Sequence, residues 1–331
     1  MPMPMLRLPH SFRRVPGLLL AALLLLVSLA PFGCRPRDPQ TAPNGPTVAL
    51  VMKTLNNPFF IDMQKGAREA AARLGVNLVV QAAEREFDVE KQMQIIENLI
   101  QRKVSVLCLT PSGSREIVPA IVKANRAGIP VLIVDTRIDR PALTAAGGRV
   151  ETFIGSDNVE GGRIAGRYVA QKLAGKGKVA ILEGVPGHET GDARLQGFRE
   201  AVKEAGLEII ASQTANWERD QGFSVFQNIL QSRPEVQAVF ACNDLMALGA
   251  TEALAAANKQ GKVIVVGFDA NDDARAAIRA GTMAGSVAQH PDDMGRIAVE
   301  KAVAYLRGET LAAEIPVKVE LINRDNAGPA K

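Results

Sequence analysis

Five polar side chains come directly after apolar, strand-like runs and are the first candidates for a binding site. They are Lys53, Asp135, Asp157, Asn243 and Asp269. In open α/β sheets a ligand binds beyond the carboxyl ends of the strands, where these side chains would supply both hydrogen-bond donors and acceptors. The alternative for each Asp or Asn is local, because these residues also cap helices and form turns. Asp157 fits that alternative best, as a capping or hinge residue.

Aromatic residues make up only 4% of the chain, with a single Trp, so those in polar surroundings are informative. Asn57 and Pro58 predict a turn that leads into a helix, because Pro is tolerated in a first helical turn. Phe59 and Phe60 then lie at the helix start, facing a strand end, and Trp217 also follows a strand-like run. A sugar ring has apolar faces and a polar rim, so aromatic rings combined with charged groups suit it. Trp217 taken alone is explained equally well by packing in the core.

The sequence contains none of the common motifs of catalytic or metal sites. The histidines are His10, His188 and His290, and no HExxH, CxxC or GxSxG motif occurs. Cys108 and Cys242 lie inside apolar runs, which indicates packing rather than a disulfide or a metal site. We therefore expect a binding protein with no enzymatic activity, no metal and no cofactor.

From residue 47 onward, short β-branched runs alternate with amphipathic segments of helical spacing. The runs are 47–53, 76–81, 104–110, 130–135, 150–157, 178–184, 208–213, 237–244 and 262–269. This alternation predicts parallel sheets covered by helices on both faces. A chain of 331 residues is too long for one core, and a new helical unit begins after Ser156 and Asp157. The predicted fold is therefore α/β, with two doubly wound parallel-sheet lobes.

The N-terminal segment predicts export. Residues 1–33 carry three arginines followed by the apolar run 17–30, which is short for a bilayer span and typical of a secretory signal. Gly before Cys34 resembles a bacterial lipobox, in which the Cys is lipidated, although Pro31 stands where Leu is preferred. The Pro-rich residues 34–46 suit a tether. The alternative is a plain secreted protein in which Cys34 has no role.

The net charge of +4 also belongs to the N-terminal segment. Residues 1–33 contain three of the 39 basic residues and none of the 35 acidic ones. The remainder is nearly neutral, whereas a nucleic-acid-binding protein needs a basic face. We expect no nucleic-acid partner, and contact with a membrane only through a lipid anchor at Cys34.

Several segments resemble the pentose and hexose receptors of bacterial ABC importers, and the resemblance covers residues 47–322. They are VALVMKTLNNPFFIDMQKGA, IVDTRID, SDNVEGGRIAG, ARLQGF, ACNDLMALGA and VVGFDANDDARAAIRAGTMAGSVAQHPDDMG. The resemblance implies a type I periplasmic binding protein fold with a multi-crossover hinge near 156–157, 289–290 and 318–319. The implied N-terminal lobe is 47–156 plus 290–318, and the implied C-terminal lobe is 157–289 plus 319–331.

The same resemblance implies which residues contact the sugar. They are Lys53, Asn57, Phe59, Phe60, Asp135, Arg194, Trp217, Asn243, Asp269 and Gln289. Lys53, Trp217 and the stretch AGGRVETF are similar to the D-allose branch of the family rather than the ribose branch. Thr136 departs from both branches, and Arg137 should point to the other side of an extended segment. The implied partners are a monosaccharide, an importer permease and a chemoreceptor.

Two further interpretations of the binding site remain open. Sugar-responsive transcriptional regulators share this two-lobed core, but they carry a helix-turn-helix where this chain has its apolar N-terminal segment. A receptor for a non-sugar small molecule, such as a nucleoside, would need an additional flat slot. If both lobes contact the ligand, the closed form binds better, and the ligand shifts a hinge equilibrium.

Overall fold

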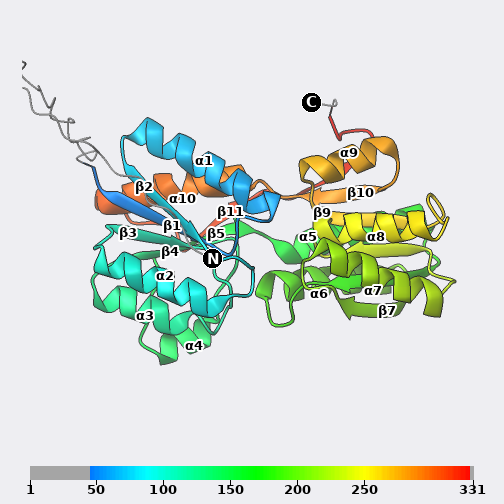
Figure 1. Ribbon diagram of the computed structural model, residues 1–331, viewed down its shortest axis with the longest axis horizontal. Helices are drawn as coiled ribbons and strands as arrows, with labels where there is room; N and C mark the ends of the chain where they lie inside the picture. The colour runs from blue at the N-terminus through cyan, green and yellow to red at the C-terminus, as the bar shows by residue number, and fades with distance from the viewer. Residues whose placement is uncertain (1–44, 329–331) are drawn as a thin grey trace, which may run out of the picture. The chain divides into compact units, whose positions relative to one another are not determined.

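The computed structural model describes residues 45–328 (Figure 1). The predicted signal segment, Cys34 and most of the tether lie outside the described residues. The described part forms twelve strands and ten helices, arranged around two six-stranded sheets. The predicted α/β fold with two doubly wound lobes is therefore confirmed. None of the helices in the described part of the chain combines the length and the apolar character that a membrane span requires.

The first sheet has the strand order β11-β5-β4-β3-β1-β2, and its neighbouring strands are parallel. Its strands are β1 (Thr47–Met52), β2 (Asn77–Ala82), β3 (Val106–Leu109), β4 (Val131–Val134), β5 (Thr152–Ser156) and β11 (Glu314–Val317). Its helices are α1 (Pro58–Leu74), α2 (Val89–Gln101), α3 (Val118–Arg126), α4 (Arg140–Ala145) and α10 (Pro291–Leu306). Figure 1 shows α1 and α10 on one side of this sheet and α2 and α3 on the other.

The alternation of side chains along β1 explains this two-sided cover. Val48 and Leu50 join the core beneath α1 and α10, whereas Ala49 and Val51 join the core beneath α2 and α3. Successive residues of a strand point to opposite faces, so a strand covered on both faces must be apolar throughout. The uninterrupted apolar runs of the sequence follow from this requirement.

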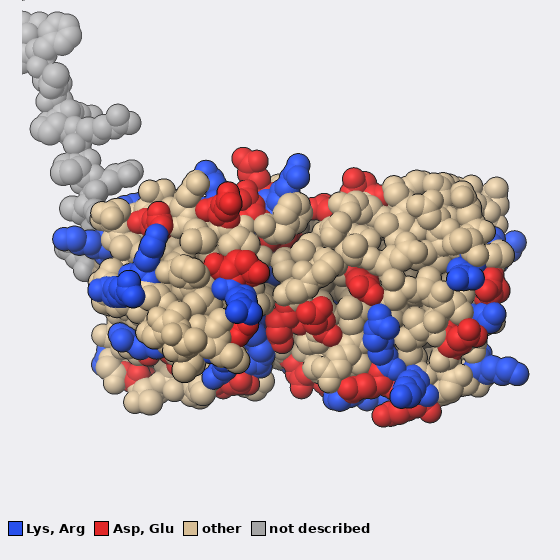
Figure 2. Space-filling view, turned by 90° about the horizontal axis from the view of Figure 1, so that it is seen from below, with Lys and Arg blue, Asp and Glu red and all other residues tan. Residues whose placement is uncertain are grey.

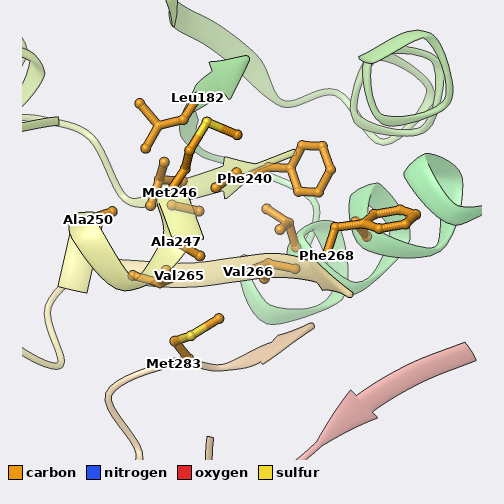
Figure 3. Close-up of a cluster of buried hydrophobic side chains, with 14 of the residues drawn as sticks. Leu182, Phe240, Met246, Ala247, Ala250, Val265, Val266, Phe268 and Met283 are labelled. Carbon is orange, nitrogen blue, oxygen red and sulfur yellow. The ribbon is translucent and has the colours of Figure 1, made fainter. Parts of the chain in front are cut away.

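The second sheet has the order β12-β10-β9-β8-β6-β7. Its strands are β6 (Lys178–Glu183), β7 (Glu208–Thr214), β8 (Ala238–Ala241), β9 (Ile264–Asp269), β10 (Gly285–Ala288) and β12 (Glu320–Asn323). Its helices are α5 (Asn158–Lys172), α6 (Glu189–Glu204), α7 (Arg219–Ser232), α8 (Asp244–Ala256) and α9 (Asp272–Ala280). Phe240 of β8, Phe268 of β9 and Met246 of α8 belong to the cluster of buried side chains that forms its core (Figure 3).

Each of the nine predicted strand runs overlaps a strand, from β1 to β9, but the last three strands were not predicted. Strands β10, β11 and β12 have four residues each; β10 begins with Gly285, and β11 contains Pro316. Such segments carry little β-propensity of their own, and their pairing in the sheets determines them. Strand β12, at the edge of the second sheet, runs antiparallel to β10, whereas the other neighbouring strands of the two sheets are parallel, as predicted.

The chain passes between the two sheets three times. It leaves the first sheet after β5, returns after β10, and leaves again between β11 and β12. The connecting segments are Asp157, Gln289–His290 and Lys318–Val319. These three short connections join the lobes without a flexible linker.

Pairs of glycines let neighbouring helices approach closely. Between α5 and α6, a Cβ atom on Gly162 would lie 2.1 Å from the carbonyl oxygen of Arg194, and one on Gly197 would lie 1.9 Å from that of Val159. Between α1 and α10, a Cβ on Gly66 would meet Asp292 at 1.9 Å. Backbone atoms cannot yield as side chains do, so these positions exclude any larger residue.

We expect Gly197→Ala to lower the free energy of unfolding by about 1–3 kcal/mol, because the added methyl group overpacks the contact between α5 and α6. In an ordinary helix the same change stabilises by roughly 0.5–1 kcal/mol, so the sign of the effect is diagnostic. Urea unfolding measures it, with Lys203→Ala on the exposed face of α6 as the matched control. A stabilised Gly197→Ala variant would contradict the close packing described here.

Candidate ligand-binding site

One cavity brings together all ten residues that the sequence analysis assigned to a site. Its empty volume is about 290 Å³, including the space at its mouth that is open to solvent. The first lobe lines it with Lys53, Asn57, Phe59, Phe60, Glu86 and Asp135, and the second lobe with Thr190, Arg194, Trp217, Asn243, Asp269 and Gln289. The two lobes contribute six residues each to this cavity.

At the carboxyl ends of β1 and β4, Lys53 and Asp135 form a buried pair of opposite charges. Lys53 Nζ lies 3.8 Å from Asp135 Oδ2, and both side chains are almost fully buried. The hydroxyl of Thr136 donates to the same oxygen at 2.8 Å. Asp135 has a φ of 65°, a conformation that costs a residue with a side chain about 1–3 kcal/mol and is found mainly at functional sites.

The aromatic wall of the first lobe is held by the start of α1. Asn57 caps the helix by accepting from the Phe59 backbone N–H at 3.0 Å, and Pro58 occupies the first helical turn, as predicted. Phe59 and Phe60 meet edge to face with ring centroids 5.2 Å apart. The Asn57 amide also donates to Glu86 Oε1 at 2.8 Å, which places a buried carboxyl group beside the rings.

Arg194 of α6 is the cation of the second lobe, and several elements hold it. Its Nε donates to Asn158 Oδ1 at 2.8 Å, and its Nη1 donates to the Cys242 carbonyl at 2.7 Å. Its guanidinium lies over the Phe268 ring, 3.9 Å from the centroid. Two of the five N–H groups of Arg194 are used in this way, and the fixed side chain lies 3.8 Å from Asp269 Oδ1.

A second buried network fixes Asp269 at the end of β9. Gln289 Nε2 donates to Asp269 Oδ1 at 2.8 Å, while Gln289 Oε1 is buried without a hydrogen-bond partner. Asp269 has a φ of 114°. The turn that follows it is held by Asp244, which accepts from the Ser286 hydroxyl at 2.6 Å and from the Asn271 backbone N–H at 2.8 Å. The unpaired Gln289 oxygen points to a donor on the ligand, since buried acceptors are rarely left unsatisfied.

Trp217 supplies the flat ring of the second lobe, and the backbone around it makes room for the indole. A Cβ atom on Gly184 would lie 2.0 Å from Trp217 Cζ2, and one on Gly191 would lie 3.1 Å from it. Trp217 itself has a φ of 69°, and its carbonyl accepts from the Asn243 amide at 3.0 Å. Trp217 is part of the buried core of the lobe and also lines the cavity, so packing in the core and a position at the cavity do not exclude each other.

A comparison with protein-family models agrees with this two-lobed arrangement. Residues 48–310 match the model described as a periplasmic binding protein domain. The chain belongs to the periplasmic binding protein family.

Relatives of this periplasmic binding protein have similar length. The ribose import binding protein RbsB of Escherichia coli is 41% identical over 276 residues, which is 83% of this chain and 90% of the relative. The D-allose-binding periplasmic protein of the same organism is 40% identical over 249 residues, 75% of this chain and 80% of the relative. A solved solute-binding protein from Actinobacillus succinogenes with bound D-allose is 37% identical, with a TM-score of 0.82 over 85% of this chain and 99% of that chain.

In this periplasmic binding protein the cavity carries three carboxyl groups but two cations, and burial raises the pKa of two of the carboxyl groups. Burial raises the pKa of Asp269 to about 7, although Arg194 and the Gln289 amide oppose the shift. Burial also raises the pKa of Glu86, against the attraction of Lys53. Because the charged form of a carboxyl group is penalised in a dry cavity, hydroxyl donors from a ligand would stabilise these carboxylates.

The cavity includes two residues that the sequence analysis missed. Glu86 lies four residues beyond the end of β2, and Thr190 lies in the first turn of α6. Polar residues directly after a strand and aromatic residues near strand ends were the signals that predicted the site. An extension of this reasoning into the loop after β2 would have included Glu86, whereas Thr190 lies seven residues beyond β6 and inside α6, where no local pattern marks it.

Other predicted positions lie outside the cavity. Asp157 caps α5 by accepting from the Glu160 backbone N–H at 2.9 Å, in agreement with the capping interpretation. Arg137 bonds Glu314 at 2.7 Å and does not line the cavity, as its position in the extended segment predicted. Cys108 and Cys242 are buried and unpaired, and burial raises the pKa of each thiol to about 12. Within residues 45–328, no group of three or more His, Cys, Asp or Glu side chains could hold a metal ion.

We expect Gly184→Ala to push the Trp217 ring out of its place, because the new methyl group would overlap the indole. Trp217 is the only Trp of the chain, so its fluorescence spectrum should shift measurably. Gly191→Ala is the matched control, since its methyl group would lie 3.1 Å from the same ring and needs only a small adjustment. Equal spectra for Gly184→Ala and the unmodified protein would contradict the placement of the ring.

Proposed function

We propose that this periplasmic binding protein is the solute receptor of a sugar ABC importer and closes around one monosaccharide. The observation that carries the proposal is the single cavity in which both lobes combine aromatic rings with buried charged groups. Relatives that are named for ribose and D-allose binding support the same class of ligand. Such receptors bind and deliver a ligand without changing it, so the protein is not an enzyme.

The cavity offers a sugar both kinds of contact that it needs. Phe59, Phe60 and Trp217 present flat apolar surfaces to the C–H faces of the ring. The charged pairs Lys53–Asp135 and Arg194–Asp269 are 3.8 Å apart, beyond hydrogen-bond distance. Their donors and acceptors can therefore bond ligand hydroxyl groups, and bonds to ionised groups are the stronger class.

Closure of the two lobes couples binding to recognition by a permease. The lobes 47–156 plus 290–318 and 157–289 plus 319–331 turn about the three connecting segments. Arg137 of the first lobe lies 3.8 Å from Glu189 of the second, which is a contact of the closed form. Because the ligand touches both lobes, it favours this form over an open one.

The favoured ligand is an aldohexose of the D-allose type, with D-ribose next. Lys53 and Trp217, the residues that resemble the allose branch, both line the cavity. The hydroxyl of Thr136, the residue that departs from both branches, bonds to Asp135 instead of lining the cavity. Thr136 therefore acts on the sugar through the orientation of Asp135.

The chain is exported by its N-terminal segment and held at the outer face of the membrane through a lipid on Cys34. Its partners are the monosaccharide, the permease of the importer and a chemoreceptor. On the face shown in Figure 2, acidic and basic side chains are interspersed.

A thermal-shift screen tests the proposed function directly. We expect D-allose and D-ribose to raise the Tm of the protein by several degrees, because a ligand selective for the folded state stabilises it. D-glucose, D-galactose, D-xylose and myo-inositol serve as comparisons, and calorimetry gives the affinities. If none of these compounds shifts the Tm, while a nucleoside does, the proposal is wrong.

We expect Asp269→Ala to weaken sugar binding at least about 100-fold, because a buried acceptor of ligand hydroxyl groups is lost. Isothermal titration calorimetry measures the affinity, and circular dichroism checks that the fold is retained. Asp325→Ala, at an exposed turn, is the matched control and should bind as the unmodified protein does. Binding by Asp269→Ala within about tenfold of the affinity of the unmodified protein would refute the role of this residue.

A further inference from the structure

His188 occupies the helix-capping position of α6 but does not act as a cap. Its side chain makes no hydrogen bond to the backbone of the helix, although Ser, Thr, Asp or Asn would do so at this position. His188 is almost fully buried, at 5% exposure, beside the cavity. Helix capping therefore does not explain why His188 is buried at the edge of the cavity, and its burial requires another explanation.

The imidazole of His188 is bonded on both sides. Trp217 Nε1 donates to His188 Nδ1 at 3.2 Å, and the two rings are inclined by 24° with centroids 6.4 Å apart. Because Nδ1 accepts, the hydrogen of the neutral imidazole is on Nε2. The backbone of Ser112 also hydrogen-bonds His188, and this contact partly opposes the lowering of the His188 pKa by burial. Because Nδ1 is occupied by Trp217, Nε2 is left as the donor, and we infer that the Ser112 carbonyl accepts.

This second bond crosses from one lobe to the other. His188 belongs to the second lobe, whereas Ser112 follows β3 of the first lobe. The Ser112 segment is itself fixed, because the Ser112 backbone N–H donates to Gln92 Oε1 at 2.8 Å. Gln92 is completely buried and donates in turn to the Thr110 carbonyl at 2.9 Å. The acceptor in the first lobe is therefore held in place before the lobes close.

We propose that His188 is a positioning residue, which orients the Trp217 indole against the sugar and fastens the second lobe to Ser112 of the first lobe. This inference rests on the proposed function, since it concerns the same cavity and its closure. It assigns to one neutral side chain two tasks that depend on each other. Closing the lobes completes the hydrogen bonds of the imidazole, and the imidazole fixes the ring that the sugar stacks on.

The arrangement requires an uncharged imidazole. A protonated His188 would carry a hydrogen on Nδ1 and could no longer accept from Trp217. Lys53 is the charged group that acts on His188, while the neighbouring Glu189 lies 3.8 Å from Arg137. Burial and the positive charge of Lys53 together lower the pKa of His188 from 6.5 to about 3. Opening of the lobes would return the imidazole to water and its pKa toward the ordinary value.

The sign of the resulting pH dependence follows from linkage. The closed form holds His188 neutral, so protons bind preferentially to the open form, and sugar affinity falls as the pH drops below about 6.5. The loss of sugar affinity caused by protonation of His188 should be about tenfold at pH 5.5. Asp269 and Glu86 add pH effects of their own. The contribution of His188 is therefore the difference in the pH-dependent loss of sugar affinity between the unmodified protein and a variant that cannot titrate at this position.

Two variants separate the roles of His188. His188→Phe keeps a ring but removes both hydrogen bonds and leaves the buried Trp217 N–H without an acceptor, so we expect sugar affinity at pH 7.5 to fall about tenfold. His188→Gln keeps one acceptor and one donor and should restore affinity to within about threefold. His188→Gln should also abolish the tenfold loss of sugar affinity that His188 causes at pH 5.5. Fluorescence of Trp217, the single Trp, reports on the ring directly, and the Tm without sugar shows whether each variant is folded.

The experiment uses the sugar that gives the largest Tm shift with the unmodified protein. If the unmodified protein binds no sugar, the proposed function fails. If it binds and His188→Phe binds equally well, the inference about His188 is wrong. It is also wrong if His188→Gln shows the same loss of affinity between pH 7.5 and 5.5 as the unmodified protein. Weaker binding by His188→Phe with rescue by His188→Gln and a flatter pH profile supports it.

Discussion

The site depends on two pairs of opposite charges that are buried away from water. In each pair the hydrogen bonds of the charged groups are incomplete. Lys53 and Asp135 form one pair in the first lobe, and Arg194 and Asp269 form the other in the second, with both pairs 3.8 Å apart. Desolvation of such groups is expensive unless hydrogen bonds satisfy them. The fold supplies some of these bonds, through Thr136, Asn158 and Gln289, and leaves others for a ligand. A polyhydroxylated molecule supplies many hydrogen bonds without adding a charge to the cavity.

The parallel sheets explain why these charges meet. The carboxyl ends of parallel strands lie at one edge of a sheet, so residues far apart in the chain arrive at the same place. Lys53 and Asp135 follow β1 and β4, while Asp269 and Gln289 end or follow β9 and β10. Both lobes are built in this way, and the two edges share one cavity. Close helix contacts, which depend on glycines such as Gly162 and Gly197, keep the helices that carry Asn158 and Arg194 in fixed positions.

The aromatic side of the site depends on backbone geometry as much as on the rings. Trp217 adopts a positive φ and lies against Gly184, where any side chain would displace it. Asp135 and Asp269 also have positive φ values. Strain of this kind persists only when the surroundings determine it, and the buried hydrogen bonds of Asp244 and Ser286 do so for the turn after Asp269. Each lobe therefore holds its own half of the site ready before a ligand arrives, which reduces the entropy that binding must overcome.

The sequence by itself determined the α/β class, the strands β1 to β9 and, from local patterns, eight of the twelve residues that border the cavity. It did so because two-sided burial leaves long apolar runs, and because polar or aromatic residues after such runs mark strand ends. The resemblance to sugar receptors added Arg194 and Gln289, which no local pattern indicates. Only the tertiary structure decided the strands β10 to β12, which owe their conformation to pairing partners. It also decided that Glu86, Thr190 and His188 belong to the site, since their positions depend on how loops and lobes meet. Local sequence encodes periodicity and burial, whereas contacts between distant loops arise only when the chain has folded.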